Sequence, residues 1–178
     1  MIQLNYVDWR HASRNNHAEY LYNELAKRNI PVNIMEPLLG GRLVKMADHL
    51  VARLKQRRPN QSVASWAFRF AGHWPKVLTV LSGMTYKEHL VDNLKTFSPH
   101  EPLTDEELEF LEETAQLYKQ YPIVDCNDCK YCMPCPYGID IPGILLHYNK
   151  CVNEGNVPKN SQEPNSRAAR RAYLVSYD

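Results

Sequence analysis

The sequence lacks the features that carry a chain into or across a membrane. No apolar run approaches the length needed to span a bilayer. The opening residues, MIQLNYVDW, have neither the basic segment nor the apolar segment of a secretory signal. The formal net charge is only +1, so charge does not indicate nucleic acid or an anionic membrane as the main partner. We therefore expect a cytoplasmic protein that binds neither nucleic acid nor membranes.

Internal repeats and low-complexity tracts are also missing, and the 178 residues suffice for one ordinary domain with a small appendage. The chain instead alternates strand and helix patterns. Apolar alternation and turn signals predict strands at residues 2–7, 31–35 and 77–81, with helices at residues 16–28, 46–57, 62–73 and 85–95. This order is typical of parallel βα units with right-handed crossovers. Three units do not close such a sheet, since a barrel needs eight.

Capping signals mark several helix starts. Ser62 can cap the third of these helices. The segments Thr85–Glu88 and Thr104–Glu107 both read as capping boxes, and the second opens an acidic helix that runs to about Tyr121. Asp140 caps a further helix that runs to about residue 153, and we read the polar residues 155–166 as a linker.

Four of the five cysteines fall within ten residues, at Cys126, Cys129, Cys132 and Cys135. Thiolates at this density suit a soft metal centre. The run matches the bacterial ferredoxin pattern C-x2-C-x2-C-x3-C-P through Cys132 and then falls one residue short. An iron–sulfur cluster is therefore the favoured interpretation, and reduced cysteines agree with the cytoplasm.

Other interpretations of the cysteines stay open. A structural zinc site usually takes two cysteine pairs set well apart, whereas only two residues separate Cys129 from Cys132. A disulfide framework belongs to short secreted chains with even cysteine counts, and this chain has five. The isolated Cys151 sits in a helical pattern, and we expect it to be a buried structural thiol.

Four segments in this order resemble the aldo/keto reductase branch that carries a ferredoxin-type C-terminal extension: PVNIMEPLLGGRL, SVASWAFRFAG, VLTVLSGMTYKEHLVDNLKTFS and CNDCKYCMPCPYGIDIP. The resemblance implies that residues 1–120 are a partial aldo/keto reductase domain, the last three βα units of a (β/α)8 TIM barrel. Residues 121–178 would then be a 4Fe-4S ferredoxin-type region, which we expect to be truncated because no second cysteine group follows. The opening strand pattern likewise leads us to expect a piece of something longer.

The family binds a nicotinamide dinucleotide, NAD(P)H, and the resemblance implies roles for ten residues. Gln3 matches the family position that holds nicotinamide, and the pyrophosphate would lie beside Pro37, Leu38, Leu39 and Gly40. The ribose would be held by Ser82, Gly83 and Met84, and the adenine by Asp92 and Asn93. A helix start near Thr85 would also offer unpaired N–H groups to an anion. Each residue has an ordinary alternative role, in a strand end, a turn or a polar helix face.

The departures from the family pattern shape the expected activity. The family's catalytic tyrosine, lysine, aspartate and histidine belong to the first half of the barrel, so no catalytic residue is assigned and the chain alone should not reduce carbonyls. Gly83 and His89 stand where basic residues commonly pair with the phosphate of NADP, which leaves the preference between NAD and NADP open.

The expected function is thus part of an NAD(P)-linked oxidoreductase with an iron–sulfur electron-transfer region containing a [4Fe-4S] cluster. Its partners would be the dinucleotide, a small carbonyl substrate in the intact parent, and a redox partner protein. A stand-alone electron-transfer module and a zinc-bound structural protein are the alternatives.

Overall fold

The computed structural model describes residues 1–12 and 16–155. The chain divides into two compact units, Met1–Gln120 and Tyr121–Asp178. The linker expected at residues 155–166 lies, after Gly155, outside the described residues. Within the described ranges, no helix combines the length and apolar character needed to cross a membrane.

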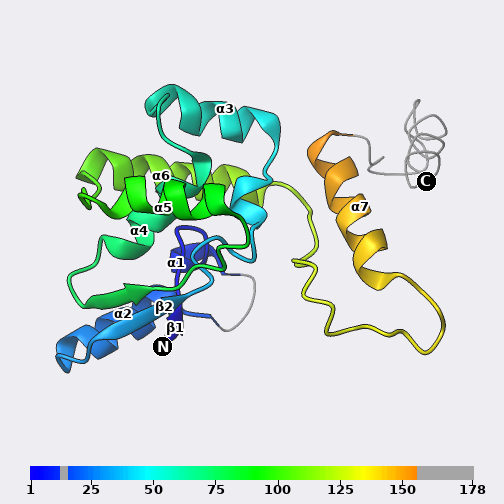
Figure 1. The fold of residues 1–178 in the computed structure, drawn as a ribbon, viewed down its shortest axis with the longest axis horizontal. Helices are drawn as coiled ribbons and strands as arrows, with labels where there is room; N and C mark the ends of the chain where they lie inside the picture. Colours follow the sequence, from blue (N-terminus) through cyan, green and yellow to red (C-terminus); the bar gives the residue numbers. More distant parts are fainter. Residues whose placement is uncertain (13–15, 156–178) are drawn as a thin grey trace. The chain divides into compact units, whose positions relative to one another are not determined.

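The first unit is built on a parallel sheet of three strands in the order β1-β2-β3 (Figure 1). Ile2 pairs with Ile34, and Val32 pairs with Val77. The strands are β1 (Ile2–Gln3), β2 (Val32–Met35) and β3 (Val77–Val80). The expectation of an α/β fold with parallel βα units is confirmed at this level.

Helices connect and cover the strands. Helix α2 packs beside β1, and α4 packs against both β3 and α5 (Figure 1). In the described residues these elements are α1 (Asp8–His11), α2 (Ala18–Lys27), the 3-10 turn η1 (Arg42–Val44), α3 (Asp48–Arg57), α4 (Val63–Gly72), α5 (Lys87–Phe97), α6 (Asp105–Lys119) and, in the second unit, α7 (Ile141–Asn153).

The first strand is shorter than the alternation predicted. It ends at Gln3, and α1 begins five residues later, at Asp8. The cause is Asn5, a fully buried residue whose Oδ1 accepts hydrogen bonds from the backbone N–H groups of Val7 and Asp8. An asparagine side chain that bonds the backbone two or three residues on competes with strand pairing. The expectation of a strand through Val7 was therefore wrong.

Two of the three expected caps on helices of the first unit are confirmed. Ser62 Oγ accepts the backbone N–H of Ser65 at the start of α4. Thr104 and Glu107 form a reciprocal capping box on α6. The box expected at Thr85 is wrong, because α5 begins at Lys87 with no side-chain cap. Thr85 instead donates its hydroxyl to the carbonyl of Gly83, within the loop after β3.

An aromatic cluster joins the first βα unit to the rest of the sheet. Trp9 of α1 stacks on Trp74, which follows α4, with ring centroids 4.2 Å apart and planes 17° from parallel. Tyr22 of α2 and Phe70 of α4 lie 5.9 Å and 5.8 Å from the Trp9 ring. Trp9, Tyr22 and Phe70 are buried. Such pairs add about 0.5–1.5 kcal/mol each beyond the area they bury, so the cluster fixes α1, α2 and α4 together.

A buried ion-pair network fixes the start of α6 against α3 and α4. Glu107 accepts from Arg58 at 2.5 Å and lies 3.7 Å from Arg69 Nη2. Burial acts to raise the pKa of Glu107, but the Arg58 hydrogen bond, the Thr104 backbone bond and both guanidinium charges outweigh it and hold that pKa below its usual value. The capping residue of α6 is therefore also the anion that two arginines share.

Strand β3 and helix α5 keep apolar side chains exposed. Leu78 of β3 is 70% exposed, and Leu94 on α5 is 57% exposed. Parallel sheets are usually buried on both faces by their crossover helices. An exposed strand with apolar side chains is a site for self-association.

Replacing Thr104 with alanine removes one half of the capping box, and we expect a loss of about 1 kcal/mol in the free energy of unfolding. The matched control is Thr85→Ala, which removes the same hydroxyl from a loop position and should cost less than about 0.5 kcal/mol. Urea unfolding of the two variants measures both values. Equal losses would mean that the Thr104 hydroxyl does not cap α6.

We expect the chain by itself to be oligomeric or prone to aggregation, because β3 leaves apolar side chains uncovered. Leu78→Lys should reduce self-association, since a charge on an exposed strand disfavours strand-to-strand contact. Light scattering measures the effect. A monodisperse monomer with one cooperative thermal transition in the unmodified chain would contradict this prediction.

Candidate functional site

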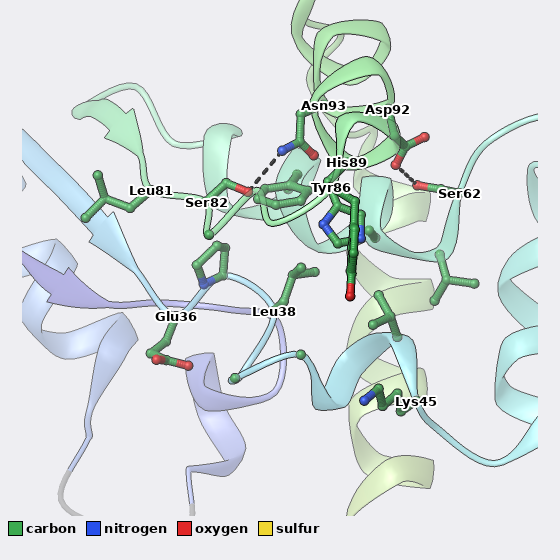
Figure 2. A pocket seen from close by; sticks show the side chains of 18 of the residues that line it. Glu36, Leu38, Lys45, Ser62, Leu81, Ser82, Tyr86, His89, Asp92 and Asn93 are labelled. Atoms are coloured by element: carbon green, nitrogen blue, oxygen red, sulfur yellow. Dashed lines mark hydrogen bonds between the residues drawn. The ribbon is translucent and has the colours of Figure 1, made fainter. Parts of the chain in front are cut away.

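A large cavity of the first unit, with a volume of about 1080 Å³, lies at the carboxyl ends of β2 and β3 (Figure 2). Its wall combines the segment after β2, the start of α4, the segment after β3 and the start of α5. The lining residues are Met35, Glu36, Pro37, Leu38, Gly40, Gly41, Val44, Lys45, Ser62, Val63, Ala64, Phe68, Leu81, Ser82, Gly83, Tyr86, Glu88, His89, Asp92 and Asn93.

Parallel pairing explains why these segments meet. Because β2 and β3 run in the same direction, their carboxyl ends lie at one edge of the sheet. Open parallel sheets bind ligands at that edge, in the crevice outside the strand ends. Segments more than forty residues apart in the sequence therefore line one cavity.

The segment after β2 approaches the cavity with an unusual backbone. Glu36, Leu39, Gly40 and Gly41 have positive φ angles of 55°, 52°, 66° and 84°. Glycine adopts this region without strain, whereas Glu36 and Leu39 need support from their surroundings. The buried Asn5 gives some of it, since its Nδ2 donates to the carbonyl of Glu36 at 3.1 Å. The same asparagine therefore ends β1 and holds the cavity loop.

Two hydrogen bonds join α5 to the rest of the cavity wall (Figure 2). Ser62 Oγ donates to Asp92 Oδ2 at 2.5 Å, and Asn93 Nδ2 donates to Ser82 Oγ at 3.0 Å. Ser62 is also the cap of α4, so one hydroxyl bonds both α4 and α5. Asp92 and Asn93 are thereby held in place before any ligand binds.

Seven of the ten residues that the resemblance implies for a dinucleotide line this one cavity: Pro37, Leu38, Gly40, Ser82, Gly83, Asp92 and Asn93. The other three do not line it. Gln3 donates its amide to Asp8 Oδ2 at 2.5 Å. Leu39 is buried at 6% exposure, and Met84 is 47% exposed. The structure thus brings together the loop and helix residues, which are assigned to pyrophosphate, ribose and adenine.

Several lining residues were not predicted from the sequence. Ser62 was recognised as a helix cap, but its bond to Asp92 spans thirty residues and had no local signal. Tyr86 and His89, whose rings meet edge to face with centroids 5.3 Å apart, present aromatic surface to the cavity. Lys45 adds a cation, opposite in charge to Glu36, Glu88 and Asp92 in the lining. Aromatic faces and mixed charge suit a ligand with a planar ring and polar groups.

The cysteine run lies in the second unit, in a segment without regular secondary structure. Cys129 and Cys132 are exposed, and Cys126 and Cys135 are half-buried. Asp128 and Lys130, which flank Cys129, have positive φ angles of 58° and 61°, so the backbone turns between the thiols. Nowhere in residues 1–12 and 16–155 do three or more histidine, cysteine or acidic side chains gather as a metal site. The metal centre therefore stays a prediction that rests on the donor types and their spacing.

Helix α7 anchors the residues just before the cysteine run. Asn149 exchanges two hydrogen bonds with the backbone of Val124, at 2.8 and 2.9 Å. Asp140 accepts the N–H of Gly143, as the predicted cap requires. Cys151 is buried at 2% exposure and lies 3.6 Å from His147 Nε2. The expectation of a buried thiol at Cys151 is confirmed.

Comparison of the chain with protein-family models, with curated proteins and with solved structures gives no match. The aldo/keto reductase resemblance thus rests on the four segments themselves, and the function is inferred from the residues of the site.

Proposed function

We propose that the chain is part of an NAD(P)-linked oxidoreductase of the aldo/keto reductase type, with an iron–sulfur electron-transfer region. Its first unit would supply three βα units of a (β/α)8 barrel, whose ligand sites lie at the carboxyl ends of the strands. The observation that carries the proposal is that the assigned residues meet in one cavity at that edge of the sheet. Seven of the ten residues assigned independently to a dinucleotide line it.

The cavity suits the adenosine and pyrophosphate parts of a dinucleotide. Its volume of about 1080 Å³ is slightly above the range for small-molecule sites, roughly 300–1,000 Å³. The left-handed Gly40 and Gly41 let the backbone approach phosphates without a side chain in the way. Asp92 and Asn93, fixed by Ser62 and Ser82, present polar atoms on the α5 side.

The residues of this chain would bind and orient the dinucleotide and not carry out catalysis. When bound, the nicotinamide ring supplies hydride chemistry toward a small carbonyl substrate of the intact parent. In the described cavity we assign no general acid or base, since the family's catalytic groups match no position here. Binding and turnover are therefore separable in this chain.

The four clustered thiols suit a [4Fe-4S] cluster by donor type, since soft thiolates are the usual ligands of such clusters. A bound cluster supplies one-electron transfer, for which a redox partner protein would be the recipient or source. Cys126, Cys129, Cys132 and Cys135 would hold it, and the exposure of Cys129 and Cys132 leaves these thiols accessible to iron and sulfide.

Adenine nucleotides should bind weakly to the folded chain, and Asp92→Ala combined with Asn93→Ala should weaken that binding about five- to a hundred-fold, because two hydrogen-bonding side chains are lost. NADP should not be strongly preferred over NAD, since Gly83 offers no positive charge. Calorimetric titration with AMP, NADH and NADPH measures these affinities.

The matched control for that experiment is Lys87→Ala, a change on the same helix at a residue outside the cavity lining. It should leave the affinity within about two-fold of the unmodified chain. Equal binding by the double variant and the unmodified chain would show that the site is misplaced. Reduction of a carbonyl with NADH by the chain alone would show that catalytic groups have been overlooked.

Protein prepared without oxygen should contain iron and acid-labile sulfide, and Cys132→Ser should lower the iron content sharply because it removes one thiolate ligand. The control is Cys151→Ser, which changes a buried thiol beside His147 and should leave the iron content unchanged. Elemental analysis and visible absorbance measure both. Stoichiometric zinc without iron would favour a structural zinc site instead.

A further inference from the structure

The connection between α5 and α6 is held against α4 in two different ways. Its second half is tied by hydrogen bonds, because Arg69 Nε and Nη2 donate to the carbonyls of Glu101 and Pro102 at 3.0 and 3.2 Å. Its first half depends on the imidazole of His100, which stacks on Phe97 with ring centroids 5.4 Å apart and planes 14° from parallel. Since an imidazole changes its charge near neutral pH and a guanidinium does not, the first half is the part that can respond to pH.

One nitrogen of the His100 ring faces the protein interior. Its Nε2 is buried and has no hydrogen-bond partner among the described residues. The ring lies so close to Gly72, at the end of α4, that a Cβ on that glycine would be 2.9 Å from Nε2. A neutral imidazole fits this arrangement by carrying its single proton on Nδ1. A protonated imidazole does not fit, because Nε2 then carries an N–H that meets no acceptor.

His73, the residue that ends α4, repeats the arrangement with its other ring nitrogen. Its Nδ1 is buried and likewise has no partner in the part of the chain that the structure describes. The neutral ring therefore carries its proton on Nε2. The ring meets Trp74 edge to face, with centroids 5.0 Å apart. Protonation would again leave a buried, charged N–H without an acceptor.

The charged groups near the two rings do not compensate for burial. Burial lowers the pKa of His100, and the positive charge of Arg69 lowers it further. Burial also lowers the pKa of His73, where Asp105 of α6 acts in the opposite direction and His100 in the same direction as burial. Each ring is therefore harder to protonate in the folded chain than in water.

The remaining charged residues around the rings point elsewhere or lie in solvent. Strand β3 carries no charged side chain. Lys95 and Glu101, on either side of His100 in the sequence, are exposed, and Lys76 donates its ammonium to Asn29. A form of the chain with both rings in water thus binds protons more readily than the packed form. Packing is favoured above the ordinary histidine pKa of about 6.5, and this contribution is lost as the pH falls through the lowered values.

We propose that the first half of the α5–α6 connection is an acid-sensitive latch, closed on α4 while His73 and His100 are neutral and opened by their protonation. Because Arg69 still holds the second half of the connection, opening is confined to residues 97–100. The latch does not rest on the proposed oxidoreductase function, since it needs neither a nucleotide nor a metal.

Opening would change the surface beside β3. Phe97 and His100 line a groove of about 360 Å³ together with Gly72 and residues 77–80 of the strand. When the two rings leave, the groove loses its α5 side. The strand is unpaired at that end of the sheet within the described residues, so acid would expose more of it.

Two measurements on the unmodified chain test the latch. Titration of the histidine ring signals by NMR gives the pKa of His100, which should lie below about 6.5. Hydrogen–deuterium exchange at the same pH values gives the protection of residues 96–100, corrected for the intrinsic effect of pH on exchange. That protection should fall by up to about ten-fold for each pH unit below about 6.5, because one proton is taken up per ring on opening.

Variants separate the latch from general effects of acid. His100→Phe keeps an aromatic ring on Phe97 that cannot take up a proton, so most of the acid dependence should disappear. His73→Gln should remove a smaller part of it. The matched control is His49→Gln, which changes an exposed histidine of α3 and should leave the acid dependence within about two-fold of the unmodified chain.

Three results would overturn the proposal. The first is a His100 ring that titrates at or above about 6.5, a result that the unmodified chain gives even if His100→Phe does not fold. The second is protection of residues 96–100 that stays constant as the pH falls. The third is an equal loss of protection in His100→Phe and in the unmodified chain, which would assign the acid effect to other groups.

Discussion

The parallel pairing of β1, β2 and β3 is the constraint on which the candidate site depends. It places the carboxyl ends of β2 and β3 at one edge of the sheet, so that the segments that follow them face a common cavity. Only one edge of β3 is paired within the described residues, which leaves backbone N–H and C=O groups of β3 available to another strand, and Leu78 on that strand is exposed. The candidate site and the predicted self-association thus both depend on how these strands pair.

Two polar side chains, those of Asn5 and Ser62, each hold several segments of the first unit in place. Asn5 ends β1 and also donates to the carbonyl of Glu36 in the cavity loop. Ser62 caps α4, holds Asp92 and lies in the wall of the cavity. Because each of these groups satisfies backbone and side-chain partners together, its replacement would change helix ends and cavity walls at once.

Local chemistry made part of this architecture predictable from the sequence. The alternation of apolar residues and turns predicted parallel βα units. The helix caps at Ser62 and at Thr104 and Glu107 could also be predicted, because each joins residues three positions apart. Thr85 has the same spacing to Glu88, but its hydroxyl donates to the carbonyl of Gly83 in the loop. Spacing alone therefore could not distinguish the capping box at Thr104 from the sequence at Thr85, which forms none.

Long-range pairs could not be predicted in this way. The Ser62–Asp92 bond and the hydrogen bonds of Arg69 to the carbonyls of residues 101 and 102 join elements about thirty residues apart. The cysteines are the opposite case: their spacing indicated a metal centre, while the described backbone holds them in an irregular segment without gathering three ligands.

Hydrogen–deuterium exchange of the chain with and without NADH tests the central claim most directly, that the two loop segments at one sheet edge bind a dinucleotide together. We predict slower exchange in both residues 36–41 and residues 81–93 at the same NADH concentrations, with little change in α2, which packs beside β1. Unchanged exchange in both segments at saturating NADH, or slowing confined to α2, would contradict it.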